Sequence, residues 1–393
     1  MFEESEIIEH GGAIDPASKA SIDFVITSRN DILSEDHTTR IAPIRKKKDN
    51  PKEETYALSE ITAGVKKLGE EYNIPAITSL NGTLGPVVAE FMAQGRAIVD
   101  ESLKSNCPFC YKNIFDSTMN PKIIHNLNID SSGFPDVKEG EAQKKVISFP
   151  NKTPNGVIDY VSVFSEHKTL PLEISELDME NFMHSSLDIA EFYRQRAGVN
   201  GIIEVINIDK SAGASQKHLH TRRTGLGIHE IVYQDIEANN LRTKLSEKDM
   251  TIDSYLDNII DPDSKAHERY IFHNDYVVIF TPRAPTYTHQ ILAFVRPPRR
   301  NILELSFDER KYVGRSMLGI LHFLQKELGV TGLNMETYQS RFGSTDNYMR
   351  MHFKISPRNI NGVEAGLEHH ALYTVTEYPE ATAAIGRKHY NKE

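Results

Sequence analysis

The sequence predicts an α+β protein in which one strand–helix–strand lobe occurs twice, behind an N-terminal extension. Residues 160–165 alternate between apolar and polar side chains like a strand, and Ser175 then opens a helix as an N-cap with an acidic first turn. The same order returns later, with Ser306 lying 131 positions after Ser175 and Gly332 lying 131 after Gly201. This offset is too long for a solenoid period. It favours a duplicated lobe over a chance similarity between two α+β segments.

Composition excludes several classes of function. The chain has 393 residues, 39% of them hydrophobic, and a formal net charge of −10. An acidic balance argues against a surface that coats nucleic acid and against a polybasic membrane anchor. The chain begins with an acidic Met-Phe-Glu-Glu-Ser-Glu segment, unlike a signal peptide, and has no apolar run of about 18 residues. We therefore expect a cytoplasmic protein with neither nucleic acid nor membrane as a partner.

The first hundred residues carry no recognisable chemistry. Residues 21–27 could form a short strand, and apolar residues recur at helical spacing over 58–72 and 86–103. The spacing predicts two amphipathic helices in those two segments. We treat residues 1–104 as an N-terminal extension whose role the sequence does not reveal.

The character of the chain changes at Cys107-Pro-Phe-Cys110, which holds the only two cysteines. A Cys-x-x-Cys pair on a tight turn is the usual first half of a tetrahedral zinc site. The alternative is a thioredoxin-like redox pair, which should stand after a strand and at the start of a helix. Residues 111–115 have no helix signature, so zinc is favoured, provided that two further ligands exist.

A second chemical motif is His218-Leu-His220. Side chains alternate along an extended segment, so these two imidazoles are expected on the same face. Just upstream lie three small residues, Gly213, Ala214 and Ser215. Small residues let backbone N–H groups approach an anion, and Lys217 and Arg222 add positive charge. The pattern suggests a site for phosphate chemistry, and a surface strand that happens to carry histidines is the alternative.

The segment Gly-Ala-Ser-Gln-Lys-His218-Leu-His220 resembles the Gly-x-Ser-x-x-His-x-His signature of the galactose-1-phosphate uridylyltransferase-like family. This family and the related nucleoside-diphosphate-sugar phosphorylases belong to the histidine-triad (HIT) superfamily. The resemblance covers about residues 106–393 and implies two HIT-like repeats, each an antiparallel sheet with packed helices. It places a first repeat with the zinc knuckle and the His-x-His pair at 105–240, and a second, non-catalytic repeat at 265–393.

The resemblance also implies roles for single residues. The segment around His167 resembles the one that carries the third zinc ligand of the family, and His218 falls where the fourth lies. The implied ligands of a structural Zn²⁺ are Cys107, Cys110, His167 and His218. Asn207 stands where the family has an asparagine that contacts the nucleotide phosphates. Asn151 lies in a Phe-Pro-Asn-Lys segment that resembles a nucleotide-binding turn. The loop residues Gly213, Ala214 and Ser215 would bind substrate.

Two departures from the family pattern stand out. The family follows its second histidine with Gly-Gln, whose glutamine holds the phosphate, whereas this chain has Thr221-Arg222. Arginine can still bind a phosphate oxygen, as a charged and planar donor. In the second repeat Arg350 replaces His218, and no small-residue loop of the same kind is evident. Because Glu336 and Arg350 occupy the positions of family iron ligands, with only His352 left, iron is not expected.

The implied reaction uses His220 as the nucleophile. Its attack on the α-phosphorus of a nucleoside diphosphate sugar would give a nucleotidyl–histidine intermediate, and an acceptor sugar 1-phosphate would then take the nucleotide. The other ring nitrogen should donate to a backbone carbonyl of the same loop. The extra charge at Lys217 and Arg222 leans slightly towards a small, highly charged acceptor, as in a phosphorylase or hydrolase of nucleoside diphosphate sugars or dinucleoside polyphosphates. A non-catalytic, zinc-stabilised nucleotide-binding protein is the third hypothesis. The family also implies a homodimer.

Overall fold

We analysed a computed structural model of the whole chain. The structure describes residues 8–15, 20–26, 38–45, 56–68, 72–79, 107–110, 113, 146–150, 158–164, 166–195, 199–227, 242–243, 245–345, 348–358 and 375–391. Within these ranges no helix combines the length and the apolar character needed to cross a bilayer.

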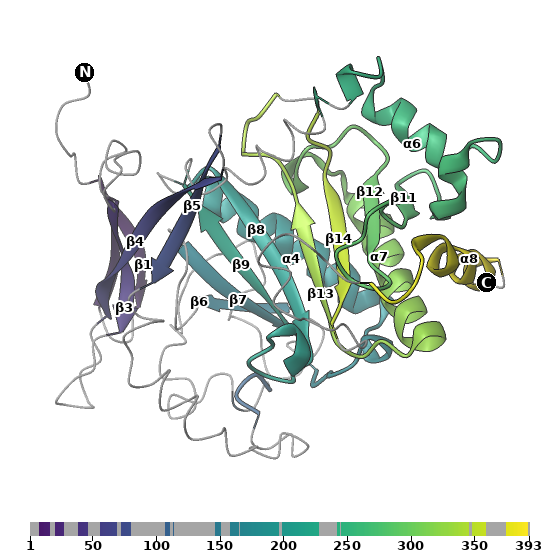
Figure 1. Ribbon diagram of the computed structural model, residues 1–393. Helices are drawn as coiled ribbons and strands as arrows, with labels where there is room; N and C mark the ends of the chain where they lie inside the picture. The colour runs from purple at the N-terminus through teal and green to yellow at the C-terminus, as the bar shows by residue number, and fades with distance from the viewer. Residues whose placement is uncertain are drawn as a thin grey trace. The chain divides into compact units, whose positions relative to one another are not determined.

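The N-terminal extension contains a five-stranded sheet in which strands adjacent in sequence are neighbours (Figure 1). Its strands are β1 (Ile8–Asp15), β2 (Ala20–Ile26), β3 (Thr38–Arg45), β4 (Tyr56–Leu68) and β5 (Tyr72–Ser79). The strand expected over 21–27 is confirmed by β2. The helix expected over 58–72 is wrong, because β4 pairs antiparallel with β3 on one side and β5 on the other. Pairing along both edges overrides a helical spacing of apolar residues, and the β-branched Ile61, Thr62 and Val65 suit a strand. The helix expected over 86–103 lies outside the described residues.

The remaining strands form a nine-stranded sheet whose order is β10-β11-β12-β14-β13-β8-β9-β7-β6. The strands of the first repeat are β6 (Val146–Pro150), β7 (Ile158–Phe164), β8 (Gly201–Ile208) and β9 (His220–Leu226). Those of the second are β10 (Tyr270–His273), β11 (Val277–Phe280), β12 (Ile291–Val295), β13 (Leu333–Tyr338) and β14 (His352–Pro357). From the β13–β8 pair outwards, β14, β12 and β11 on one side match β9, β7 and β6 on the other. This mirrored order confirms the α+β fold with a duplicated lobe.

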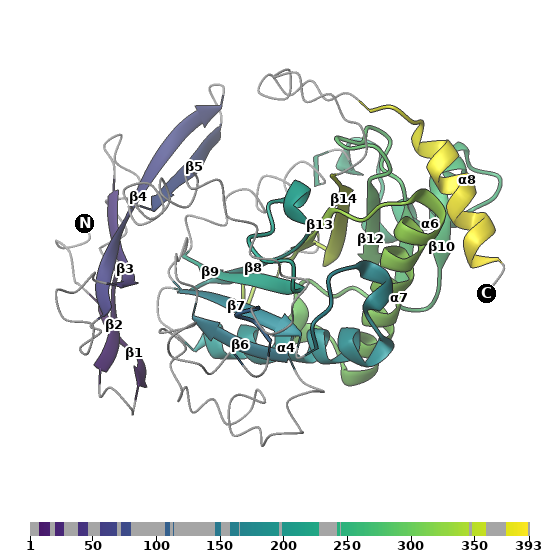
Figure 2. The ribbon, with the colours of Figure 1, turned by 90° about the horizontal axis from the view of Figure 1, so that it is seen from below.

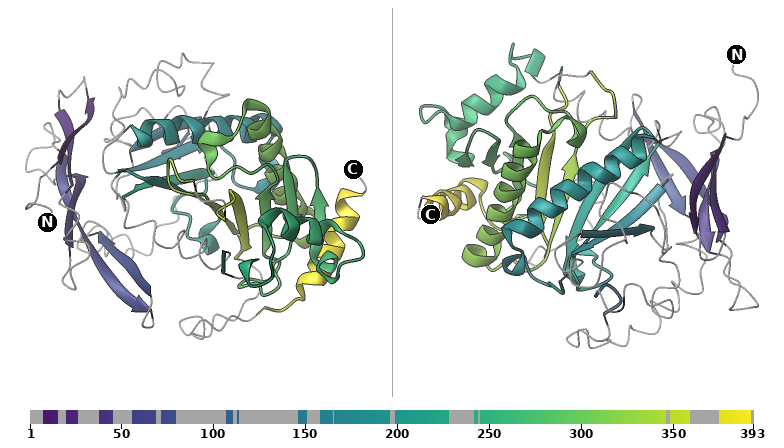
Figure 3. Two further views of the ribbon diagram at one scale, coloured as in Figure 1. Left: turned by 90° about the horizontal axis from the view of Figure 1, so that it is seen from above. Right: turned by 180° about the vertical axis from the view of Figure 1, so that it is seen from behind.

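Two long helices cover one face of this sheet and lie side by side (Figure 3, right). Helix α4 (Glu176–Arg194) belongs to the first repeat and α7 (Phe307–Leu328) to the second. Arg315 of α7 pairs with Glu176 and Glu180 of α4. The N-cap expected at Ser306 is present, because its hydroxyl accepts the Glu309 amide in a capping box.

Two further helices pack against the strands of the second repeat. Helix α6 (Ile252–Ile260) packs its apolar side onto β11 and β12 in one buried cluster that includes Leu256, Val278 and Phe294. Helix α8 (Pro379–Tyr390) runs alongside β10 (Figure 2), where Gly386 lies so close to Ile271 that an added Cβ would be 2.8 Å from the isoleucine side chain.

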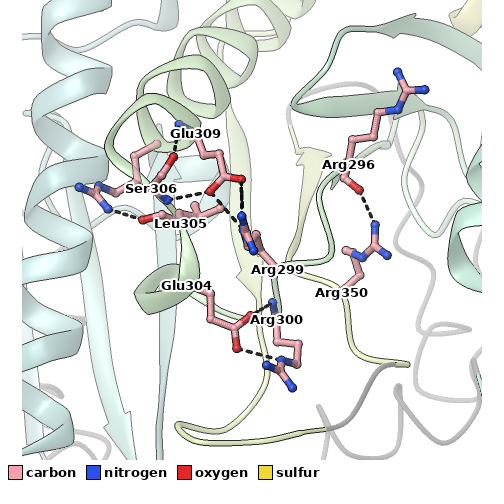
Figure 4. A network of polar contacts seen from close by, with 9 residues as sticks. Arg296, Arg299, Arg300, Glu304, Leu305, Ser306, Glu309 and Arg350 are labelled. Atoms are coloured by element: carbon pink, nitrogen blue, oxygen red, sulfur yellow. Dashed lines mark hydrogen bonds and ion pairs between the residues drawn. The ribbon is translucent and has the colours of Figure 1, made fainter.

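The duplication extends to individual contacts around the start of each long helix. In the first repeat Lys168 pairs with Asp178, and the Lys168 carbonyl accepts the Leu219 amide at 2.8 Å. In the second repeat Arg299 pairs with Glu309 (Figure 4), and the Arg299 carbonyl accepts the Met351 amide, also at 2.8 Å. Lys168 and Arg299 are 131 positions apart, and so are Asp178 and Glu309.

By internal contacts the chain forms two compact units that interleave along the sequence, one of them made of residues 1–167, 188–202 and 222–233. The domain boundaries at 1–104, 105–240 and 265–393 remain a prediction.

Candidate active site and metal centre

Four side chains with metal-binding atoms converge in the first repeat. The ligand atoms of Cys107, Cys110, His167 and His218 all lie within 4.8 Å of one another. The two cysteines stand on a turn closed by the hydrogen bond from the Cys110 amide to the Cys107 carbonyl, at 3.2 Å. His167 comes three residues after β7, and its Nδ1 lies 3.1 Å from Cys110 Sγ. These are the four residues expected as metal ligands, and they are close enough to hold a metal ion.

The chemistry of this cluster favours a metal over a redox pair. Neither cysteine forms a disulfide within the described part of the chain, and Cys107 is 1% exposed. Burial, with a contribution from the neighbouring Cys110, raises the pKa of the Cys107 thiol to about 12. A thiol in such surroundings stays neutral unless a cation displaces its proton. Two thiols and two imidazoles are a donor set that suits tetrahedral Zn²⁺.

His220 begins β9, directly after this cluster, and is 8% exposed. Its Nδ1 lies 2.8 Å from the carbonyl oxygen of His218. A backbone carbonyl can only accept, so Nδ1 carries the proton and Nε2 carries the lone pair in the neutral ring. The expected hydrogen bond to a carbonyl of the same loop is therefore present. The imidazole is held in the tautomer that a nucleophile needs.

The loop between β8 and β9 contains a tight turn whose backbone amides donate hydrogen bonds within the turn itself. Asp209 has φ 71° and ψ 159°, a conformation that favours glycine, and its carboxylate accepts the Ser211 amide at 2.9 Å. Gly213 has φ 83°, and the amides of Gly213 and Ala214 donate to the carbonyls of Lys210 and Asp209. The Gly213 and Ala214 amides are thus engaged within the turn. Binding of substrate by Gly213, Ala214 and the exposed Ser215 stays a prediction.

Arg222 forms an ion pair with Asp159 of β7. Its Nε donates to Asp159 Oδ2 at 3.0 Å, its Nη2 pairs with the same carboxylate, and Thr224 Oγ1 donates to Oδ1 at 3.2 Å. The Asp159 side chain is fully buried, whereas that of Arg222 is 31% exposed. Tyr160, the next residue along β7, packs on the α4 rings of Phe192 and Tyr193. Because neighbouring strand residues face opposite ways, Arg222, and with it His220, lies on the face of the sheet opposite to α4.

Asn207 lies half-buried on β8, opposite Asn334 of β13. Asn334 Nδ2 donates to Asn207 Oδ1 at 2.6 Å and to the carbonyl of Ala212 at 2.9 Å. A residue of the second repeat therefore contacts both the expected phosphate-binding asparagine and the turn before the histidines.

The corresponding positions of the second repeat differ from the metal-binding cluster of the first. Arg350, which stands for His218, donates to the Arg296 carbonyl at 2.6 Å (Figure 4) and to Asp253 of α6 at 3.0 Å. His352, which stands for His220, lies between the rings of Phe294 and Tyr338, at centroid distances of 4.3 and 5.0 Å. A guanidinium thus ties this repeat to α6 where the first repeat gathers metal-binding atoms.

The segment before β14 in the second repeat also contains a glycine with a positive φ, and the expectation that this repeat lacks a phosphate loop stays a prediction. Gly343, followed by Ser344 and Thr345, has φ 71°, close to the 83° of Gly213.

Two residues that the sequence analysis did not select belong to the site, Asp159 and Asn334. Asp159 had a signal, since a carboxylate inside an apolar strand needs a partner. Asn334, Glu336 and Tyr338 form an alternating polar pattern along β13, and this pattern could have pointed to Asn334. Of the expected site residues, Asn151 alone lies outside the described residues.

The fold is shared with several solved structures, although no family model and no curated protein matches the sequence. An ADP-glucose phosphorylase from Arabidopsis thaliana, solved with bound ADP-glucose, matches with a TM-score of 0.59 and 15% identity, over 72% of this chain and 90% of that one. A GalT-like protein from the same plant matches with a TM-score of 0.58 and 18% identity, over 72% and 92%. A uridylyltransferase matches with a TM-score of 0.56 and 16% identity, over 63% and 85%. At these identities the matches show the fold, and they confirm the expected resemblance at that level.

Proposed function

We propose that this chain, which has the fold of the galactose-1-phosphate uridylyltransferase-like proteins, is a nucleotidyltransferase that works through a nucleotidyl–histidine intermediate. The observation that carries the proposal is the hydrogen bond between His220 Nδ1 and the His218 carbonyl. It fixes both the ring orientation and the tautomer that a nucleophilic imidazole needs, and in this repeat the ring follows directly on a metal ligand candidate, His218.

In the first step His220 Nε2 attacks the α-phosphorus of a nucleoside diphosphate sugar. An N–P bond forms, the bond to the bridging oxygen breaks, and sugar 1-phosphate leaves with the bridging oxygen. In the second step a phosphate oxygen of the acceptor attacks the same phosphorus and breaks the N–P bond, which regenerates the imidazole. Asn207 is placed in this scheme as a donor to the phosphate oxygens.

The second repeat supports the placement of Asn207. Tyr338 lies 131 positions after Asn207, and His352 lies 132 after His220. Tyr338 and His352 are register partners on adjacent strands, and their rings stack. If the first repeat has the same relation, the Asn207 amide would lie beside His220, within reach of a phosphate bound there.

The metal centre has a structural role in this proposal. Zn²⁺, when bound, would supply no open position for chemistry, because two thiolates and two imidazoles fill a tetrahedral site. The side chain of His218 would be one of those ligands, while its carbonyl accepts from His220. His218 therefore links the metal centre to the orientation of the nucleophile.

The pairing of Arg222 with Asp159 bears on the acceptor. The pair carries no net charge, so position 222 offers the phosphate a neutral partner, as the glutamine of the family would. This removes Arg222 from the argument from extra charge for a small anionic acceptor, and a sugar 1-phosphate is proposed as the acceptor from the resemblance. A homodimer is proposed from the resemblance, and light scattering at micromolar concentration tests it.

The test uses nucleoside diphosphate sugars labelled with ³²P in the α-phosphate. Wild-type protein should acquire acid-labile label, His220→Asn should acquire none, and His352→Phe, which alters the matching histidine of the second repeat but keeps a stacked ring, should be labelled like the wild type. Chasing the labelled protein with sugar 1-phosphate, inorganic phosphate or water then identifies the acceptor. Label on His220→Asn at the wild-type level would overturn the proposal.

A further inference from the structure

Asn334 holds a particular position between two acceptors. It lies on β13, and its side-chain nitrogen donates to the Ala212 carbonyl at 2.9 Å and to Asn207 Oδ1 at 2.6 Å. Ala212 belongs to the turn that precedes the histidine pair, and Asn207 is the register partner of Asn334 on β8.

These two contacts determine which atom is the donor and which is the acceptor in each hydrogen bond. A backbone carbonyl can only accept, so the Asn334 atom that faces Ala212 has to be the amide nitrogen. That nitrogen also faces Asn207, which must therefore present its oxygen to Asn334. The Asn207 NH₂ group consequently points the other way, and among the described residues it has no acceptor in the protein.

We propose that Asn334 is a positioning residue, which orients the Asn207 amide so that its NH₂ group meets the anionic oxygens of a bound nucleoside phosphate. This inference rests on the proposed function. Without Asn334 the Asn207 amide can turn over, and its carbonyl oxygen would then face the phosphate and repel it. The non-catalytic repeat thereby contributes to substrate binding in the catalytic one.

The decisive variant is Asn334→Asp, which keeps the size of the side chain but replaces the donor with an acceptor. A carboxylate at this position accepts hydrogen bonds, so it favours the rotamer of Asn207 whose NH₂ group faces residue 334. The amide oxygen of Asn207 then faces the phosphate. Loss of one hydrogen bond to a charged group corresponds to about a 10- to 100-fold change in binding. We expect Kd for AMP or UMP, measured by calorimetry, and KM for the nucleotide sugar to rise by this factor, with a smaller effect on kcat. Asn334→Ala, which removes the donor without reversing the bond, should have a smaller effect of the same sign.

A double-mutant cycle separates positioning from a merely structural role. In an Asn207→Ala background there is no amide to turn, so adding Asn334→Asp should change Kd for the nucleotide by less than about twofold. Thr337→Ser, on the same strand with its side chain on the opposite face, controls for disturbance of β13. Circular dichroism and metal content verify that each variant is folded.

Two outcomes overturn the inference: nucleotide binding by Asn334→Asp equal to the wild type, or an equal loss with and without Asn207. Covalent labelling of the same samples keeps the two proposals apart. Absence of label on the wild type contradicts the proposed function, whereas normal label together with unchanged binding by Asn334→Asp contradicts only the role of Asn334.

Discussion

His220 and His352 make the same hydrogen bond in the two repeats. The Nδ1 atom of each lies 2.8 Å from the carbonyl oxygen of the residue two positions earlier, which is His218 in one repeat and Arg350 in the other. The orientation of the imidazole is therefore a property of the duplicated lobe. What differs is the side chain beside it, a potential metal ligand in the first repeat and a guanidinium in the second. This difference underlies the first prediction.

Substitutions at His218 and His220 should fail in different ways, although the two residues are neighbours. His220→Gly should keep the fold and the metal but lose at least about 1,000-fold in turnover, because the covalent intermediate cannot form. His218→Asn should lose metal and thermal stability first, and activity as a consequence. Turnover, metal content and Tm measured on both variants check this. Added imidazole should partly restore His220→Gly and leave His218→Asn unchanged. Turnover by His220→Gly at the wild-type rate contradicts the mechanism.

Purified protein should contain about one zinc per chain, measured by plasma mass spectrometry. Cys107→Ser and Cys110→Ser should lose the metal and lower Tm markedly, because a structural metal contributes folding free energy directly. His273→Gln is a suitable control, since His273 is half-buried, bonds to Tyr270 and lies outside the cluster. Full metal content in a Cys107→Ser/Cys110→Ser double variant would show that the ligands are wrongly assigned.

Arg222→Gln restores the residue of the family but should be destabilising here. It leaves the buried carboxylate of Asp159 without its ion-pair partner. Breaking such a pair costs roughly 2–4 kcal/mol when one member is partly exposed. The double variant Arg222→Gln/Asp159→Asn removes the uncompensated charge, and its free energy of unfolding in urea should return to within about 1 kcal/mol of the wild type. Equal stability of Arg222→Gln and wild type would mean that the pair contributes little.

The Arg299–Glu309 pair should make stability depend on pH in the acid range. Burial opposes the charged form of Glu309, but hydrogen bonds from Arg299 and Ser306 outweigh it and lower its pKa below the ordinary 4.5. The folded state thus binds this proton less readily than the unfolded state, so the contribution is present above about pH 5 and is lost as pH falls through the folded-state pKa.

Glu309→Gln should accordingly reduce the free energy of unfolding by about 1–2 kcal/mol at pH 7, because it removes a charge-assisted hydrogen bond and part of a helix cap. Urea denaturation at several pH values between 3.5 and 7 should show the gap to wild type narrowing below pH 4.5. A gap that stays constant over this range would contradict the role of the ionised carboxylate.

Local patterns in the sequence were enough to predict most of the secondary structure that forms the core of the two repeats. Capping signals at Ser175 and Ser306, and alternation along β7, depend on nearby residues only, and the structure confirms the elements that they predicted. Helix α6 had a local signal too, since Thr251 and Ser254 form a capping box, but it was overlooked. The strand β4 was misread because pairing with β3 and β5, which spacing cannot show, decides its conformation.

The candidate site depended more on distant contacts. The two cysteines share one short motif, and the resemblance to the family added His167 and His218 as the other expected metal ligands. Arg222 appeared to be a free cation because its partner Asp159 lies 63 positions away. The role of Asn334 depends on Asn207, 127 positions away, and no pattern within either segment pairs them. Partners of this kind follow from strand order, which becomes visible only when the sheet is assembled.

The junction between β8 and β13 has the form of an isologous subunit interface inside one polypeptide. Ile206 pairs with Met335, and Glu204 pairs with Thr337, so that shifting either pair by 131 positions gives the other pair with its members exchanged. A contact surface that maps onto itself in this way is the hallmark of a symmetric dimer. The chain can thus be regarded as a fused pair, and fusion lets the two halves vary independently. Under the proposed function, one half retains the nucleophile and its metal-binding neighbours, while the other supplies Asn334 across the junction.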